Sequence, residues 1–112
     1  SSRGEREDDA GTALRARLVR LFLERYGAAP ERLRRARAAG GEGAEALRAL
    51  AHDLKGTAPL LQLDALGRAA ADATARLHRP GADPQGPELR ATLDRLEAML
   101  DEALEHLAAA GR

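Results

Sequence analysis

The stretch PELRATLDRLEAMLDEALEHL, residues 87–107, carries the pattern that decides the fold class. Its leucines are spaced by four, three, four, four and three residues, at Leu89, Leu93, Leu96, Leu100, Leu104 and Leu107. Side chains at this spacing lie along one face of an α-helix, and polar residues occupy the opposite face. The pattern therefore predicts a helix that begins near Pro87 and buries its leucine face in a helical bundle.

The composition of the whole chain also favours helices over strands. The 112 residues include 26 alanines and 19 leucines but one valine and no isoleucine, and Phe22 and Tyr26 are the only aromatic residues. Strands favour β-branched and aromatic residues, whereas helices favour alanine, leucine, arginine and glutamate. A chain of this length suits one domain. We expect an all-α protein with a core of leucine and alanine.

Four further helices are predicted upstream from the apolar periodicity and from the positions of glycine and proline. The first ends at Tyr26, the second runs from Pro30 to Gly40, the third from about Ala44 to about Leu61, and the fourth from an Asp64 cap to near His78, followed by a loop at residues 79–87. These lengths predict an antiparallel four-helix bundle with an additional N-terminal helix. We interpret the polar residues 1–10 as a flexible linker and residues 11–112 as the bundle domain.

Charge and cysteine content argue against several classes of function. Basic and acidic residues number 18 each and there is no cysteine, so the chain has no net pull toward nucleic acid and no disulfide or thiolate metal site. The arginine run ERLRRARAA, residues 31–39, is interpreted as a solvated helix face. We expect no signal peptide, since no charged start is followed by an apolar middle, and no apolar run approaches the roughly 20 residues of a membrane span. We expect a cytoplasmic domain without nucleic-acid or membrane contact.

The stretch LAHDLKGTAPL, residues 50–60, holds one of the three histidines of the chain. A helical projection at about 100° per residue places Leu47, Leu54 and the other apolar residues of this segment in one arc. His52 and Gly56 fall outside that arc, and Lys55 lies at its border. We therefore predict that His52 is exposed on the helix surface.

The neighbours of His52 suggest a chemical role for its side chain. Lys55 and Gly56 follow at the spacing of adjacent helix positions, and Arg48 lies one turn before. A neutral imidazole is nucleophilic and can carry a covalent intermediate. Phosphoryl transfer depends mainly on positioning and on neutralising charge. An exposed histidine beside a cation and an open flank therefore suits a phosphoryl carrier.

The segment AHDLKGTAPLLQLDAL, residues 51–66, resembles the signature of histidine-containing phosphotransfer (HPt) domains. That signature is roughly Ala-His-x-Leu-Lys-Gly followed by two small residues, and the residues upstream are similar to the first helices of the family. Two positions depart from it. The family usually has glycine ten residues after the histidine, where this chain has Gln62, and Pro59 removes a helix hydrogen bond and should kink the helix or end it early.

The resemblance implies that His52 accepts a phosphoryl group from a receiver-domain aspartate, or from a histidine kinase, and passes it to an aspartate of a response-regulator receiver. It implies that Lys55 and Arg48 balance phosphate charge and that Gly56 gives the partner access. Arg48, Pro59 and Gln62 are candidate partner-binding positions. The chain would be a monomeric phosphocarrier rather than a true enzyme, free or within a hybrid sensor histidine kinase. It would bind no metal or cofactor, and the receiver would bring Mg²⁺.

Other interpretations remain open at this point. The bundle could be an interaction module that binds a receiver or kinase without phosphotransfer, and the phospho-accepting domain of a chemotaxis-type kinase shares the motif. The pair His52 and Asp53 also resembles the HD pair of metal-dependent phosphohydrolases. Adjacent helix residues diverge by about 100°, however, so these two side chains are poorly placed to share one ion.

Overall fold

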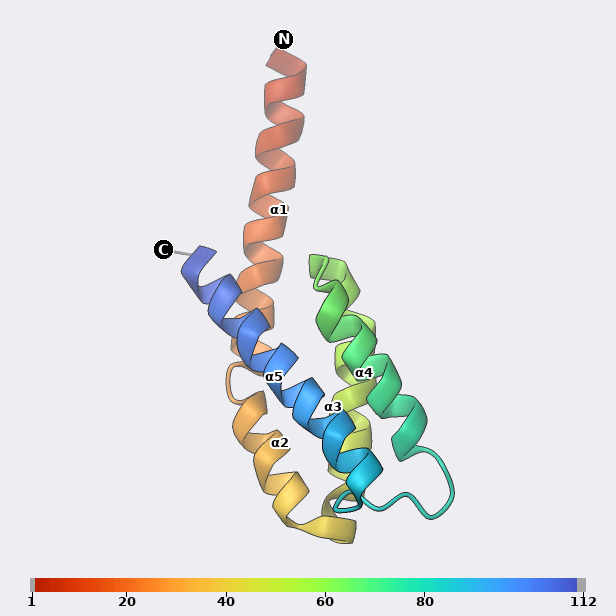
Figure 1. Ribbon diagram of the computed structural model, residues 1–112. Coiled ribbons are helices and arrows are strands. Elements are labelled where there is room, and N and C mark those ends of the chain that lie inside the picture. Colours follow the sequence, from red (N-terminus) through yellow and green to blue (C-terminus); the bar gives the residue numbers. More distant parts are fainter. Residues whose placement is uncertain (1, 111–112) are drawn as a thin grey trace.

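The computed structural model describes the backbone of residues 2–110 and the side chains of residues 8–110. It contains α1 (Ser2–Tyr26), α2 (Ala29–Ala38), α3 (Ala44–Thr57), α4 (Asp64–Leu77) and α5 (Pro87–Ala110), with 3₁₀ turns η1 (Gly40–Gly43) and η2 (Ala58–Leu61) (Figure 1). The described residues form no strand, and the prediction of an all-α fold is confirmed. No helix in this part of the chain is both long and apolar enough to cross a membrane.

Helices α2 to α5 form an antiparallel four-helix bundle in which successive helices run in opposite directions (Figure 1). α4 packs between α3 and α5, and α2 contacts both α3 and α5. α1 precedes α2 and lies beyond its N-terminal end, toward the other end of the bundle, where it contacts α5 and η2. Its N-terminal part extends beyond the bundle, which makes the molecule 58 Å long and 23 by 18 Å across. The predicted additional N-terminal helix is therefore present.

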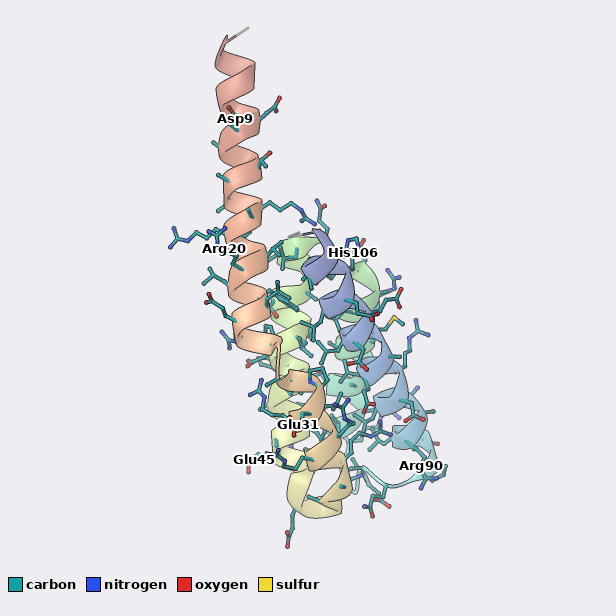
Figure 2. The ribbon with its side chains drawn as sticks, turned by 90° about the vertical axis from the view of Figure 1, so that its left-hand side faces the viewer. Asp9, Arg20, Glu31, Glu45, Arg90 and His106 are labelled. Atoms are coloured by element: carbon teal, nitrogen blue, oxygen red, sulfur yellow. The ribbon has the colours of Figure 1, made fainter. Side chains whose placement is uncertain are left out.

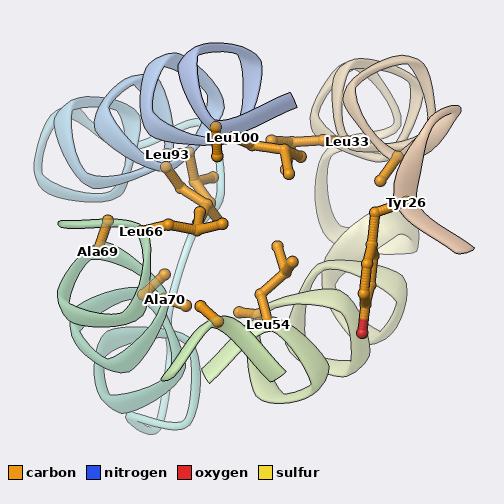
Figure 3. Packing of buried hydrophobic residues seen from close by; sticks show 14 of the residues in the cluster. Tyr26, Leu33, Leu54, Leu66, Ala69, Ala70, Leu93 and Leu100 are labelled. Carbon is orange, nitrogen blue, oxygen red and sulfur yellow. The ribbon is translucent and has the colours of Figure 1, made fainter. Parts of the chain in front are cut away.

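The core consists mainly of leucines and alanines from α2 to α5, and α1 contributes Phe22 and Tyr26. Figure 3 shows Leu33, Leu54, Leu93 and Leu100 pointing toward the bundle axis, with Tyr26 between α1 and α3. Alanine takes many of the contact positions on α4, and its small side chain lets neighbouring helices approach closely. Because burial of apolar surface drives folding, the leucine pattern of the sequence determines which face of each helix points inward.

The helix boundaries agree with the sequence predictions except in three places. The segment 1–10, expected as a flexible linker, lies within α1 from Ser2 onward, because arginine, glutamate, aspartate and alanine all tolerate a helix. The division of the chain at residue 10 stays a prediction. Asp64 is not the cap of α4, since the N-cap is Leu63 and no side chain caps that end. α3 ends at Thr57 instead of near Leu61, as expected if Pro59 breaks the helix early.

The turn after η2 is a Schellman motif built on an unusual residue. The backbone N–H of Leu63 donates to the carbonyl of Ala58 at 3.0 Å, and the N–H of Gln62 donates to that of Pro59 at 3.0 Å. Gln62 has φ 58° and ψ 32°, which is the left-handed conformation that glycine adopts most easily. The position where this chain departs from the usual glycine is therefore the position where the backbone favours one.

Candidate functional site

His52 lies on the outer face of α3, where its side chain is exposed. Leu47, Ala51 and Leu54 of the same helix are buried, with exposed fractions of 1% or less. The exposure predicted from the helical projection is therefore confirmed. Because the opposite face of α3 is fixed in the core, the imidazole is presented on a rigid element instead of a loop.

Gly56 leaves the helix surface next to His52 uncovered. A Cβ atom placed at Gly56 would meet no heavy atom within 4 Å, so no packing requires glycine here. Its backbone is helical, so no unusual dihedral angle requires glycine either. Glycine within a helix costs about 1 kcal/mol relative to alanine. Gly56 therefore weakens α3, and no contact among the described residues offsets this cost.

Two cations accompany His52 on α3. Lys55 is exposed and Arg48 is half-buried, at the helix positions three residues after and four residues before the histidine. Neither forms an ion pair with an acidic side chain in the described part of the chain. Their charges are therefore available to an anion on this face.

A contact between α1 and α3 lies on the other side of His52. Arg25 Nη2 is 3.1 Å from Asp53 Oδ2, and the hydroxyl groups of Tyr26 and Thr57 share a hydrogen bond of 3.1 Å. The Thr57 hydroxyl also donates to the Asp53 carbonyl at 2.8 Å. Sequence reasoning missed this contact because the partners are 28 and 31 residues apart and no local pattern joins them.

Pro59 and Gln62 lie beyond the end of α3, and both are exposed. The structure therefore places His52, Lys55 and Gly56 together on one helix, while these two candidate partner positions lie on the adjoining turn. Leu60 of the same turn is 67% exposed, and Leu21 of α1 is 49% exposed. Both border a small apolar hollow of about 140 Å³ between α1 and η2, which sequence reasoning did not identify.

The other two histidines have different surroundings. His78 lies just after α4, and its Nδ1 is 2.7 Å from the Thr74 carbonyl, as expected for a histidine at a helix C-terminus. His106 is exposed on α5. Among the described residues, no three histidine, aspartate or glutamate side chains come together to hold a metal ion. Asp53 pairs with Arg25, so the described residues offer no set of metal ligands for the HD interpretation.

Comparison with protein families connects this arrangement to a known class. The family model described as Hpt domain matches residues 17–110 of the chain. No curated protein and no solved structure matches the chain. The matched range covers the C-terminal part of α1 and all of the four-helix bundle, including the exposed face of α3. The chain therefore belongs to the Hpt domain family, whose members transfer phosphoryl groups through a histidine in two-component phosphorelays.

Proposed function

We propose that this domain is a phosphorelay carrier in which His52 is the phosphoacceptor. The observation that carries the proposal is the exposed imidazole on the rigid face of α3 beside the open surface of Gly56. His78 is engaged with a backbone carbonyl, and His106 has no glycine or lysine at the corresponding positions. His52 is thus the histidine with the surroundings that a carrier needs.

The transfer step is a displacement at phosphorus. The lone pair of His52 Nε2 forms an N–P bond while the O–P bond to a receiver aspartate breaks, and the aspartate leaves as a carboxylate. The reverse reaction on a second receiver returns the group to an aspartate. The receiver supplies the acidic residues and Mg²⁺ for both reactions. Lys55 offsets the charge of the bound phosphoryl group, with Arg48 contributing from one turn away.

Access to His52 determines which donors can react. Because Gly56 lacks a side chain, the surface of a receiver can approach the imidazole closely. The exposed Leu60 and Leu21 offer apolar contact area next to the site, and Pro59 and Gln62 lie at its edge. We propose that a receiver domain docks on this face, and that a histidine kinase is the other partner, in the same or a separate polypeptide. A monomer in the cytoplasm fits this role, since one chain supplies the whole bundle.

Chemical phosphorylation tests the acceptor without requiring the cognate partner. Phosphoramidate would be incubated with the wild type, with His52→Gln, and with His106→Gln as a matched control on another exposed histidine. We expect an acid-labile, base-stable adduct of one phosphoryl group, read by intact mass, in the wild type and in His106→Gln but not in His52→Gln. A folded wild type without an adduct, or an adduct that persists in His52→Gln, would favour the interaction module without phosphotransfer.

A further inference from the structure

We propose that Arg25 is a positioning residue for the phosphoacceptor site and acts through Asp53. By pairing with the Asp53 carboxylate, Arg25 removes a negative charge from the surface next to His52. The inference rests on the proposed function, because it concerns the charge that His52 would carry as a phosphohistidine. By this proposal, a residue of α1 affects the phosphorylation of His52 on α3.

Arg25 and Asp53 form a direct ion pair, and neighbouring contacts of α1 with α3 hold it in place. Arg25 Nη2 lies 3.1 Å from Asp53 Oδ2, and the side chains are 61% and 47% exposed. The Arg25 guanidinium carbon also lies 5.5 Å from the centre of the Tyr26 ring. Tyr26 is 2% exposed and shares a hydrogen bond with Thr57, so the end of α1 that carries Arg25 is held against α3.

The position of Asp53 makes its charge relevant to His52. At about 100° per residue, Gly56 lies between His52 and Asp53 on the surface of α3. Gly56 has no side chain, and a Cβ atom placed there would meet no heavy atom of another element within 4 Å. The two side chains diverge, but an unpaired Asp53 carboxylate would still lie close enough to a phosphoryl group on His52 for their charges to repel each other. It would oppose the positive charge that Lys55 provides on the other side.

The size of this effect follows from charge and distance. A phosphoryl group carries a charge of nearly two, and we take its separation from the Asp53 carboxylate as on the order of 8 Å for Coulomb's law in water. Exposing the carboxylate should slow phosphorylation by about fivefold at low ionic strength and by about twofold at physiological salt, where screening is stronger. A salt-dependent change of this kind distinguishes electrostatics from packing.

The test measures the rate of His52 phosphorylation by phosphoramidate in the wild type, Arg25→Gln, Asp53→Asn and the double variant. In this reaction the N–P bond to Nε2 forms as the P–N bond of phosphoramidate breaks and ammonia leaves. The matched control is Arg76→Gln, which removes a comparable ion pair with Asp72, 3.0 Å long, on α4. Melting temperatures are recorded for every variant, and the rates are measured at low and at physiological salt.

We expect Arg25→Gln to react about fivefold more slowly at low salt and the double variant to return to the wild-type rate without regaining the melting temperature. Arg76→Gln should react like the wild type. Equal rates in the wild type and Arg25→Gln, or a double variant as slow as Arg25→Gln, would overturn the inference. If Arg25→Gln does not fold, the test rests on Asp53→Asn. In that variant Arg25 is free of its partner, so phosphorylation at low salt should be faster than in the wild type. An unchanged rate would overturn the inference. A wild type that is not phosphorylated at all would instead refute the proposed function.

Discussion

Gly56 lowers the stability of α3 relative to alanine, and no contact among the described residues offsets this loss. A methyl group in its place would touch nothing, and alanine would make α3 more stable. The role proposed for it, access for a receiver, concerns a large partner rather than a small donor. Stability, reaction with a small donor and reaction with a receiver should therefore respond differently to substitution at this position.

We expect Gly56→Ala to raise the free energy of unfolding by about 0.5–1 kcal/mol. Gly56→Leu should slow transfer from a phosphorylated receiver by about tenfold or more, because small displacements of the reacting groups cost large factors in rate. Its rate with phosphoramidate should stay near that of the wild type. Urea unfolding and transfer assays would check this. Equal slowing with both donors would contradict the access role.

Gln62 is a residue with a Cβ atom in a backbone conformation that favours glycine. Its φ of 58° carries a steric cost for any residue with a Cβ atom, and glycine avoids this cost. We expect Gln62→Gly to raise the free energy of unfolding by about 1 kcal/mol, measured by urea denaturation. Gln62→Val should lower it, since a β-branched residue fits this conformation least well. A loss of stability in Gln62→Gly would show that the glutamine side chain makes a favourable contact of its own.

At the level of single residues, the sequence predicted what depends on local spacing. The exposure of His52 and its proximity to Lys55 and Gly56 follow from the helical period alone. The contact between Arg25 and Asp53 could not be predicted in this way, because it depends on how α1 is placed against α3. The exposed Leu60 was missed because it follows Pro59, where the helical period no longer applies.

Among the helices, α2 makes its polar contacts with α5 mainly through Arg37, and Arg34 adds a longer pair with Glu97 at 3.9 Å. Arg37 Nη2 lies 2.6 Å from Asp94 Oδ1, its Nη1 lies 3.3 Å from Glu97 Oε1, and it also donates to the Arg90 carbonyl at 3.4 Å. The Arg37 side chain is 19% exposed, so its contacts are less screened than those of a fully solvated pair. The arginine run, interpreted as a solvated face from its sequence, thus contains two residues, Arg34 and Arg37, that pair with acidic residues of α5.

We expect Arg37→Gln to lower the free energy of unfolding by about 1–2 kcal/mol, because Asp94 loses its cation and Glu97 keeps only the longer pair with Arg34. Arg35→Gln is the matched control on the same helix. It removes an exposed pair with Glu31 and should cost at most about 0.5 kcal/mol. Chemical denaturation of both variants checks the comparison. Similar losses in the two variants would mean that the contacts of Arg37 with α5 add nothing beyond an exposed pair.

For the whole molecule, the number and order of the helices could be predicted because leucine spacing, glycine and proline mark them in the sequence. The course of α1 could not be predicted, because its polar N-terminal part lacks an apolar face to indicate a helix. Figure 2 shows Asp9 and Arg20 projecting from this helix into solvent, and residues 8–17 are all exposed. The buried contacts of α1 begin in the turn that contains Leu18.

We expect a chain that begins at residue 12 to unfold with a free energy within about 0.5 kcal/mol of that of the full chain, because residues 8–11 are exposed and an isolated helix adds little. A chain that begins at residue 27 should lose several kcal/mol, since it lacks the buried Phe22 and Tyr26. Thermal and urea unfolding would compare the three lengths. A clear loss in the shorter deletion would indicate that the exposed part of α1 packs against the bundle.

The placement of Tyr26 has a practical consequence. It is the only tyrosine in a chain without tryptophan, and it is buried between the helix that carries Arg25 and the helix that carries His52. Its intrinsic fluorescence therefore comes from a single known place, with no label needed. The emission should follow the attachment of α1 to α3 in real time, so the protein contains its own optical reporter for movements next to the phosphoacceptor face.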